Sequence, residues 1–487
     1  MANIKKSKKS VKSTKNIKIV NSVKKNNGKN QYVQGSELEG VMKLSEAIPL
    51  GLQHVLAMFA GNLTPILIVC AACGITAGTE LQITIIQNAM LVAGITTLVQ
   101  TITIGPIGGR LPIVMGTSSG FIGVMRTVAA TMGGGVIGYG AILGASIIGG
   151  LFEGVLGFFL KPLRKLFPSV VTGTVVLSIG LSLIPVGINS LCGGQGVLDF
   201  GSVENLFVGI VVMVVIILLK HYTKGITSVA SILFGIIVGY LMVIIMERFL
   251  PTTFVSTDSS VITKSWVLQW DKVNEAKYFA IPKLLPVKLI FDLRAIIPML
   301  IMFIVTAVET IGDISGITEG GLNREATDKE LSGGVMCDGI GSTFAALFGV
   351  LPNTSFSQNV GLVGITKVVN LFAISIGGIF LVLCGLFPKL AAVVSIMPQS
   401  VLGGAAVLMF SAIAISGMKL IAKNGITDRE ITIVSVALGL GYGLGSVSNS
   451  LSQLPQFVSL IFGGSGIVPA AIFAIVLNLI IPEKKKK

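Results

Sequence analysis

The chain has 487 residues, of which 52% are hydrophobic and only 12% charged, and its mean hydropathy is +0.88. A water-soluble protein of this length needs many more polar residues to cover its surface, so the composition excludes a soluble globule and places the chain in lipid. The net charge of +14 gathers at the ends: residues 1–30 contribute +10 and residues 483–487 contribute +3. Nothing aromatic or folded accompanies these lysines, so we expect no nucleic acid as a partner.

Both ends of the chain are predicted to be tails. Residues 1–44 are expected to form a disordered basic tail, and residues 482–487 a second basic tail. The first tail has no apolar stretch with a small-residue cleavage site, which excludes a signal peptide, and its lysines could contact anionic lipid. By the positive-inside rule both tails lie in the cytoplasm, which requires an even number of membrane spans.

Apolar runs fill the remainder of the chain. Crossing about 30 Å of hydrocarbon takes about 20 apolar residues in a helix, and long unbroken runs exclude a β-barrel with its short alternating strands. The runs lie at about 48–73, 83–104, 112–130, 136–160, 169–187, 205–220, 228–249, 294–317, 333–350, 355–369, 371–393, 399–418, 431–447 and 464–481. Between twelve and fourteen spans fit these runs, and fourteen satisfies the even number, so we predict an all-α polytopic membrane protein with fourteen segments.

A long polar connection at 250–293 divides the runs into two sets of seven. We predict a first repeat at 45–249, an extracellular connection at 250–293 and a second repeat at 294–481. Because each repeat would hold an odd number of spans, the two would be inverted relative to one another. The basic connections all follow even-numbered runs and therefore lie on the side of the termini, which agrees with this orientation.

One stretch of sequence recurs at matching places in the two repeats. Residues 111–127 read LPIVMGTSSGFIGVMRT, and residues 351–367 read LPNTSFSQNVGLVGITK. Each is expected to be extended chain followed by a short helix, in segments 3 and 10. Such backbone is tolerated at membrane depth only where protein or a water-filled cavity satisfies it, and paired interruptions in inverted repeats indicate a substrate site at the midplane. The alternative is that proline and glycine merely kink two packed helices.

Few ionisable residues lie inside the predicted spans, and each is a candidate functional residue because charge is costly there. Glu309 and Asp313 are four residues apart, on one face of a helix, where two carboxylates that resist ionising together can share a proton. Asp338 lies early in the next run. The pair Gln53-His54 lies in the first run, and His54 could equally be a packing residue or a functional one.

Other polar residues in the spans have simpler explanations. Glu153 and Glu247 lie close enough to interfaces or helix ends for solvation to account for them. Cys70 and Cys73 have the spacing of a redox or zinc motif, but no second pair or nearby histidine accompanies them, so they are predicted to pack in the apolar core. We expect no metal site, no cofactor other than a coupling proton, and no enzyme activity, since no histidine-carboxylate cluster, phosphate loop or soluble catalytic domain is present.

A family resemblance rests on these residues. The stretch Gln358-Asn359-Val360-Gly361, four further residues and then Thr366-Lys367 resembles the signature of the nucleobase-ascorbate transporter family. The Gln53-His54 pair, the Glu309 to Asp313 spacing, the position of Asp338 and the Leu-Pro stretch with Gly116-Thr117-Ser118 also resemble that family. The similarity runs in order from about residue 45 to 481.

The resemblance implies a fold and a mode of action. Family members have fourteen segments in two inverted sevens, divided into a core domain of segments 1–4 and 8–11 and a gate domain of segments 5–7 and 12–14. They form homodimers in the cell membrane and import nucleobases by alternating access, and bacterial members mostly couple uptake to protons. A channel, a sodium-coupled carrier and an anion exchanger of related architecture are the alternatives within transport.

The resemblance also implies site residues. Glu309 would accept hydrogen bonds from substrate N–H groups, Gln358 would bind the edge of the base, and Asn359 would support that geometry. The matching backbone of the first repeat lies at Ser119 and Gly120, where family members often have an aromatic residue and alanine. His54, Gln53, Asp313, Asp338 and Thr366 would support the site or couple protons.

The residue at position 358 bears on the substrate. Uracil carriers of this family tend to have glutamate there, while xanthine and urate carriers have glutamine. An amide offers a donor and an acceptor, which complement the adjacent C=O and N–H groups of an oxidised purine, whereas a carboxylate only accepts. We therefore predict xanthine, with urate, guanine and hypoxanthine open and a uracil permease as the alternative.

Overall fold

The protein was analysed as a computed structural model that describes residues 35–160, 168–194, 196–255, 261–423, 425–447, 451, 453–454, 462 and 466–482. Most of the predicted basic N-terminal tail, at 1–34, and residues 483–487 of the C-terminal tail lie outside this part of the chain. The described part is predominantly helical, with two small two-stranded sheets.

Each apolar run predicted from the sequence holds at least one helix. The helices are α1 (Leu44–Ala72), α2 (Glu80–Ile102), α3 (Ile122–Thr131), α4 (Gly135–Phe158), α6 (Ser169–Leu191), α7 (Val203–Tyr222), α8 (Ile226–Val229), α9 (Ser231–Phe249), α10 (Trp270–Glu275), α11 (Leu293–Leu322), α12 (Asp328–Leu347), α13 (Ser357–Thr366), α14 (Leu371–Cys384), α15 (Pro388–Ser395), α16 (Gln399–Ala422), α17 (Asp428–Ser446) and α19 (Ile467–Ile480). Among the described residues, eight helices are long and apolar enough to cross a membrane.

The predicted run 371–393 is not one straight helix. It consists of α14 and α15, which meet at an angle of 84°. Pro388 is the first residue of α15, and the preceding Phe387 has φ −113° and ψ 87°, outside the helical region. A proline ring restricts the residue before it in this way, and proline itself has no N–H to continue a helix from the previous turn.

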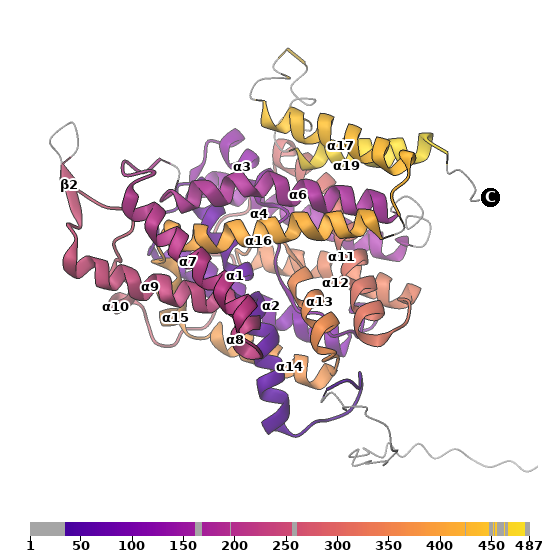
Figure 1. Ribbon diagram of the computed structural model, residues 1–487, viewed down its shortest axis with the longest axis horizontal. Coiled ribbons are helices and arrows are strands. Elements are labelled where there is room, and N and C mark those ends of the chain that lie inside the picture. Colours follow the sequence, from indigo (N-terminus) through magenta and orange to yellow (C-terminus); the bar gives the residue numbers. More distant parts are fainter. Residues whose placement is uncertain are drawn as a thin grey trace, which may run out of the picture.

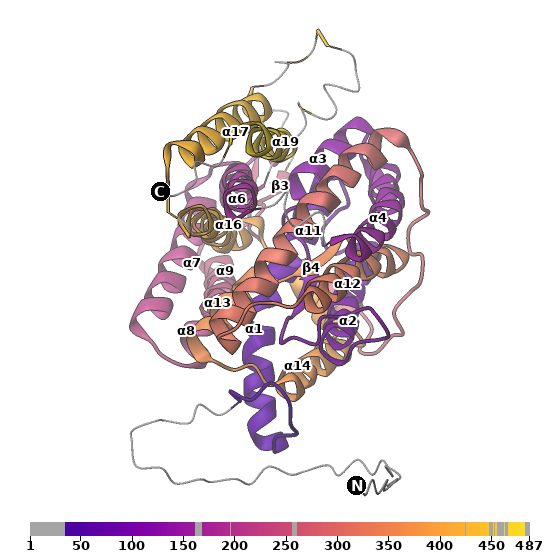
Figure 2. The same ribbon diagram turned by 90° about the vertical axis from the view of Figure 1, so that its right-hand side faces the viewer.

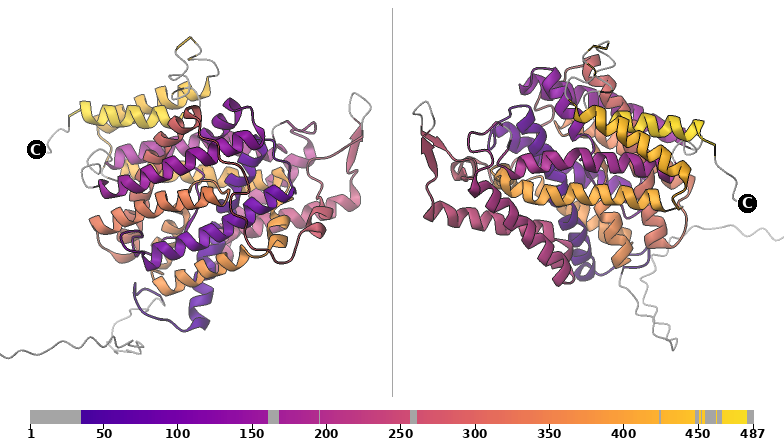
Figure 3. Two further views of the ribbon diagram at one scale, coloured as in Figure 1. Left: turned by 180° about the vertical axis from the view of Figure 1, so that it is seen from behind. Right: turned by 45° about the horizontal axis from the view of Figure 1, so that its top comes forward.

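The helices pack in two groups. Group A holds α1 to α4 and α11 to α15, and group B holds α6 to α9, α16, α17 and α19; most close contacts of each helix are made within its own group. Figure 2 shows group B on the left, with α6 and α16 seen end on, and α2, α4, α11 and α12 on the right. The right-hand view of Figure 3 shows α6 and α16 running side by side.

Two short strands meet between these helices. β1 (Met115–Thr117) pairs antiparallel with β4 (Asn353–Ser355), and Gly116 lies opposite Thr354. Each strand is followed by a helix of ten residues, α3 or α13, so an extended stretch precedes a short helix at both predicted places. Because the strands run in opposite directions, the two helices leave the sheet at opposite ends.

Side chains from the surrounding helices satisfy the strand backbone, as irregular chain at membrane depth requires. Asn62 of α1 accepts a hydrogen bond from the Thr117 N–H at 2.7 Å, and Thr97 of α2 accepts one from the Met115 N–H at 2.9 Å. Ser342 of α12 bonds both the N–H and the C=O of Asn353, at 2.9 Å each. The sheet is therefore anchored to three helices of group A.

The connection 250–293 has structure of its own. It contains the hairpin of β2 (Thr253–Val255) and β3 (Val261–Thr263), which extends from the helical body in Figure 1, followed by α10. At its end Asp292 caps α11 by accepting a hydrogen bond from the Arg294 N–H at 2.8 Å. Hydrogen bonds from the Arg294 side chain lower the pKa of Asp292 to about 2, so this cap stays ionised at any ordinary pH.

Candidate functional site

A narrow pocket lies where β1–α3 and β4–α13 meet α11. Residues from both helix groups line this pocket. They are Thr117, Ser118, Ser119, Gly120, Ile179, Glu309, Thr354, Ser355, Phe356, Ser357, Gln358 and Ile413. Four of the five predicted substrate-binding residues are thus brought together, namely Glu309, Gln358, Ser119 and Gly120. Group B contributes only the apolar side chains of Ile179 on α6 and Ile413 on α16.

Asn359, the fifth predicted residue, is not among the pocket-lining residues. It is fully buried, and its amide points to α1, where it donates to the carbonyl of His54 at 3.0 Å and lies 3.2 Å from the Nδ1 atom of the same residue. His54 is also buried, and its Nε2 atom has no hydrogen-bond partner. The pair joins α13 to α1 directly behind Gln358.

Glu309 and Asp313 lie one turn apart on α11, as their spacing predicted. One carboxylate oxygen of Glu309, Oε2, is buried without a hydrogen-bond partner. Asp313 is held by the second Leu-Pro stretch: Ser355 donates to its Oδ2 at 2.7 Å, and Ser357 donates to its Oδ1 at 2.8 Å. Asp313 therefore fixes the junction of β4 and α13, while Glu309 faces the pocket.

Asp338 lies on α12, on the far side of the same junction, and is fully buried. Its Oδ2 accepts hydrogen bonds from Thr310 of α11 and from Thr354 of β4, the latter at 3.1 Å. The Oδ1 atom is buried and has no partner. Asp338 does not line the pocket but binds two of the elements that form it.

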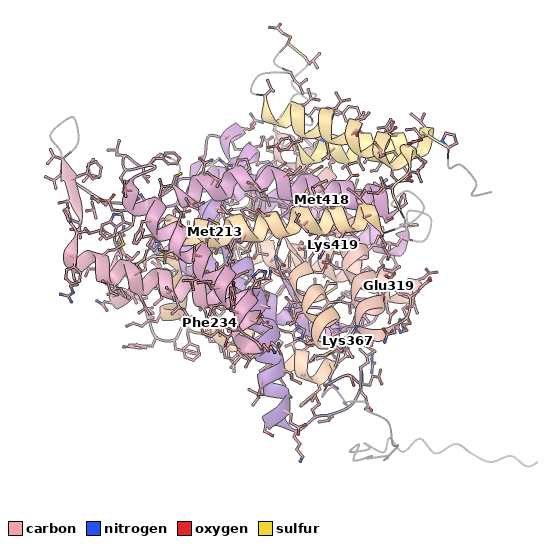
Figure 4. The ribbon with its side chains drawn as sticks, viewed as in Figure 1. Met213, Phe234, Glu319, Lys367, Met418 and Lys419 are labelled. Carbon is pink, nitrogen blue, oxygen red and sulfur yellow. The ribbon has the colours of Figure 1, made fainter. Side chains whose placement is uncertain are left out.

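Two predicted residues lie away from the pocket. Thr366 is in the last turn of α13, where its hydroxyl donates to the Leu362 carbonyl at 2.8 Å. The next residue, Lys367, ends the helix with φ 59° and donates to the Gly320 carbonyl of α11; Figure 4 shows it beside α13. Gln53 is half-buried next to His54 and does not line the pocket.

The aromatic residue of the first stretch is directed away from the pocket. Phe121 is fully buried against Phe303 of α11, with ring centroids 4.7 Å apart and an interplanar angle of 60°. It does not line the pocket, whereas Phe356 from the second stretch does. The Phe356 ring also packs against β1, since a Cβ at Gly116 would lie 2.7 Å from it.

Sequence reasoning missed the hydroxyl groups that hold the carboxylates. Thr310, Thr354, Ser355 and Ser357 are ordinary residues in a sequence, and only the folded contacts reveal their role.

The interpretation of Glu153 is wrong: its side chain is 0% exposed, so solvation does not account for it. It lies five residues before the end of α4, but α11 and α12 cover it. Cys70 and Cys73 are buried in the main apolar cluster, where packing was predicted.

Within the described residues, no group of three or more His, Cys, Asp and Glu side chains is arranged to hold a metal ion.

A second cavity lies at the ends of α4 and α12. It is lined by Gly157, Phe158, Leu160, Asp328, Lys329, Leu331 and Ser332. Its lysine and aspartate lie at a helix start and none of the predicted residues reaches it, so the pocket beside Glu309 is the candidate site.

The family model "Permease family" (Xan_ur_permease) matches residues 45–449 of this chain. The chain belongs to the nucleobase-ascorbate transporter family. It is 36% identical over 438 residues to the uric acid permease PucK of Bacillus subtilis, which covers 90% of this chain and 95% of that protein. It is 34% identical over 445 residues to the xanthine permease of Bacillus subtilis, covering 89% and 93%. It is 31% identical over 469 residues to the xanthine permease XanP of Escherichia coli, covering 93% and 96%.

Solved structures agree on the fold. The transmembrane domain of the cyanobacterial bicarbonate transporter BicA matches with a TM-score of 0.54 and 15% identity, over 90% of this chain and 98% of that one. The anion transporter Slc26a9 of mouse matches with a TM-score of 0.52 and 9% identity, over 89% and 68%. This chain is therefore a multi-pass membrane protein with a transporter fold, and it is a transporter and not an enzyme.

Proposed function

We propose that this transporter imports a purine nucleobase, with xanthine as the first candidate and urate or another oxidised purine as the next. The observation that carries the proposal is the joint position of Glu309 and Gln358 in one pocket formed by the two Leu-Pro stretches. Relatives named as xanthine and uric acid permeases align over about nine-tenths of the chain, which supports the same substrate class.

Hydrogen bonding explains why such a pocket would select an oxidised purine. The Gln358 amide offers one donor face and one acceptor, so it can pair with neighbouring C=O and N–H groups of the base edge. Glu309 only accepts, and its unpartnered Oε2 is available to a substrate N–H group. A base that leaves either group unpaired in the closed site loses about 1–3 kcal/mol per group.

The two helix groups support transport by alternating access. We propose that group A is the core domain and group B the gate domain, within two inverted sevens of fourteen segments; the antiparallel pairing of β1 and β4 supports the inversion. The gate would present Ile179 and Ile413 to the base and slide against the core. An exposed ion pair spans the two groups, between Lys423 after α16 and Glu319 of α11 at 2.8 Å. Exposed pairs contribute at most about 1 kcal/mol, so this one can break in each cycle.

We also propose proton symport, a homodimeric assembly and cytoplasmic termini. Three acidic side chains, Glu309, Asp313 and Asp338, lie around one junction, and a neutral purine carries no charge to balance them. A proton that binds with the substrate would do so. Sodium coupling is the alternative, and replacing sodium with choline in the uptake buffer separates the two.

The test is uptake of radiolabelled xanthine by proteoliposomes that contain the purified protein. Under an inward proton gradient we expect xanthine to accumulate above its external concentration, and collapse of the gradient by an uncoupler should abolish accumulation. Glu309→Gln should reduce uptake by about 10–100-fold, because it removes a charged acceptor worth about 1.5–3 kcal/mol. Glu247→Gln is the matched control, because Glu247 lies on α9, outside the pocket, where it accepts a hydrogen bond from the Leu268 N–H. No purine uptake by the wild type would refute the proposal.

The same assay separates the alternative substrates. A tenfold excess of uracil should leave xanthine uptake nearly unchanged if Gln358 selects the purine, whereas strong competition by uracil would favour a uracil permease. The likeness to bicarbonate and anion transporters raises an anion exchanger as another reading. Sulfate and bicarbonate lack the purine edge that Glu309 and Gln358 would bind, so we expect them not to compete.

A further inference from the structure

Glu153 is a buried acid that the site described above does not use. It lies on α4 with 0% of its side chain exposed. Its Oε1 accepts one hydrogen bond, from Thr306 of α11 at 3.2 Å, and its Oε2 is buried with no partner. An isolated carboxylate at this depth costs several kcal/mol, which is why such a residue needs an explanation beyond packing.

Glycines bring the backbone of α4 against α12 at this level. A Cβ on Gly150 would lie 2.5 Å from the Gly339 carbonyl oxygen, and a Cβ on Gly339 would lie 2.2 Å from the Gly154 nitrogen. These contacts flank Glu153 on one helix and adjoin Asp338 on the other. Glu153 and Asp338 are therefore held at the same height on two touching helices, with no space for lipid between their backbones.

A third helix, α11, contacts both Glu153 and Asp338. Thr306 bonds Glu153, and Thr310, one turn later, bonds Asp338. One further turn on, Asp313 accepts from Ser355 and Ser357 at the pocket. Thr310 and Ser355 thus connect Asp338 to Asp313 beside the pocket. Glu153 and Thr306 lie one helical turn before Thr310, so Glu153 is the member of this row of acids farthest from Gln358.

Among the described residues, none of the ion pairs involves Glu153, Glu309, Asp313 or Asp338. The ionisable groups that act on Glu153 are Asp338 from α12 and Glu309 from α11, both acidic. The third neighbour, α3, meets α4 near Gly138, about four turns away, and its one ionisable residue is Arg126. Four ionised carboxylates would repel one another strongly here, so the row must hold protons.

We propose that Glu153 is a proton-binding residue of this row, one that stores or relays the proton moved with the substrate. In this step an O–H bond forms on Glu153 as one breaks on a neighbouring carboxylic acid, and the row keeps its total charge. The residue acts on transport through Asp338 and Glu309 and touches no substrate, so it is a positioning and proton-holding group. This inference rests on the proposed proton-coupled purine uptake.

The test compares the wild type with Glu153→Gln in proteoliposomes, because glutamine keeps the shape and the Thr306 contact but binds no transferable proton. Three quantities are measured: xanthine binding, exchange of labelled for unlabelled xanthine at equal pH on both sides, and the stimulation of uptake by an inward proton gradient. In Glu153→Gln, xanthine binding and exchange should stay within about threefold of the wild type. The stimulation of uptake by the proton gradient should fall by about fivefold or more, and the pH profile of uptake should become flatter. Glu247→Gln should leave all three unchanged.

Each outcome decides between the two proposals. Wild-type protein without purine uptake would refute the proposed function, and the inference with it. Wild-type protein with gradient-driven uptake, together with full gradient stimulation in Glu153→Gln, would overturn only the role of Glu153. Where Glu153→Gln does not fold, Thr306→Val replaces it: loss of the one hydroxyl partner should shift the pH midpoint of uptake, and an unchanged midpoint would overturn the inference.

Discussion

The two stretches that meet at the pocket are built alike but contribute differently. Each begins with Leu-Pro, forms a three-residue strand and continues into a ten-residue helix. The first contributes backbone and small residues, Ser119 and Gly120, and directs its aromatic side chain Phe121 away from the pocket. The second contributes Gln358 and Phe356 to the pocket and the serines that bind Asp313.

This difference shows how a repeated local structure can become a two-sided site with one selective side. The antiparallel pairing of the short strands holds the two stretches side by side, so both line one pocket although their helices leave the sheet at opposite ends. Selectivity can then reside in the second stretch, while the first supplies a wall of fixed shape. Substitutions in each stretch test this division of labour.

Truncation of one residue in each stretch tests the division directly. Gln358→Ala should weaken xanthine binding by about 10–100-fold, since the loss of two hydrogen bonds to a buried base costs roughly 1.5–3 kcal/mol. Ser119→Ala, in the matching stretch, should change affinity by less than about threefold, because small residues there act through their backbone. Equilibrium binding to purified protein measures both, and equal losses would contradict the comparison.

Exchange of the amide for a carboxylate should change selectivity and leave the fold intact. Gln358→Glu replaces a donor–acceptor group with an acceptor and should shift the ratio of xanthine to uracil uptake toward uracil by about tenfold or more. Uptake of xanthine, urate and uracil by cells that express each variant measures this ratio. An unchanged purine preference would remove the main support for xanthine as the substrate.

A methyl group added at either of two glycines of the first stretch should affect a different property of the protein. At Gly116 a Cβ would lie 2.7 Å from Met58 and Phe356 and 2.8 Å from Asn62, so Gly116→Ala should destabilise the protein by about 1–3 kcal/mol. At Gly120 the nearest atom would be 3.3 Å away, so Gly120→Ala should fold normally and weaken binding only a few-fold by narrowing the pocket. Thermal unfolding in detergent, alongside xanthine binding, distinguishes the two.

The support behind Gln358 is expected to be shared between two residues. Asn359→Ala and His54→Ala each break the contact between α13 and α1, so their effects on xanthine affinity should not add; we expect a coupling energy of about 0.5–1.5 kcal/mol. A double-mutant cycle on binding measures this energy. Strictly additive effects would mean that the buried pair does not position Gln358.

Sequence patterns predicted much of this arrangement. Apolar runs located the helices within a few residues, because hydrophobic length is dictated by the membrane, and the repeated Leu-Pro stretch predicted extended chain before both short helices. The pairing of the two extended stretches as strands was not predicted. The bend between α14 and α15 was missed, although Pro388 was a visible signal. The role of Glu153 was missed as well, because its burial depends on glycine contacts between α4 and α12, which are far apart in the chain. The hydroxyl partners of Asp313 and Asp338 likewise depend on long-range contacts.

A structure of the protein in complex with xanthine would show whether a purine binds between Glu309 and Gln358. We expect the base in the pocket between the two Leu-Pro stretches, with one edge within hydrogen-bonding distance of the Gln358 amide and an N–H group directed at Glu309. A base bound elsewhere, such as in the cavity at the ends of α4 and α12, or one in the pocket that contacts neither side chain, would contradict it.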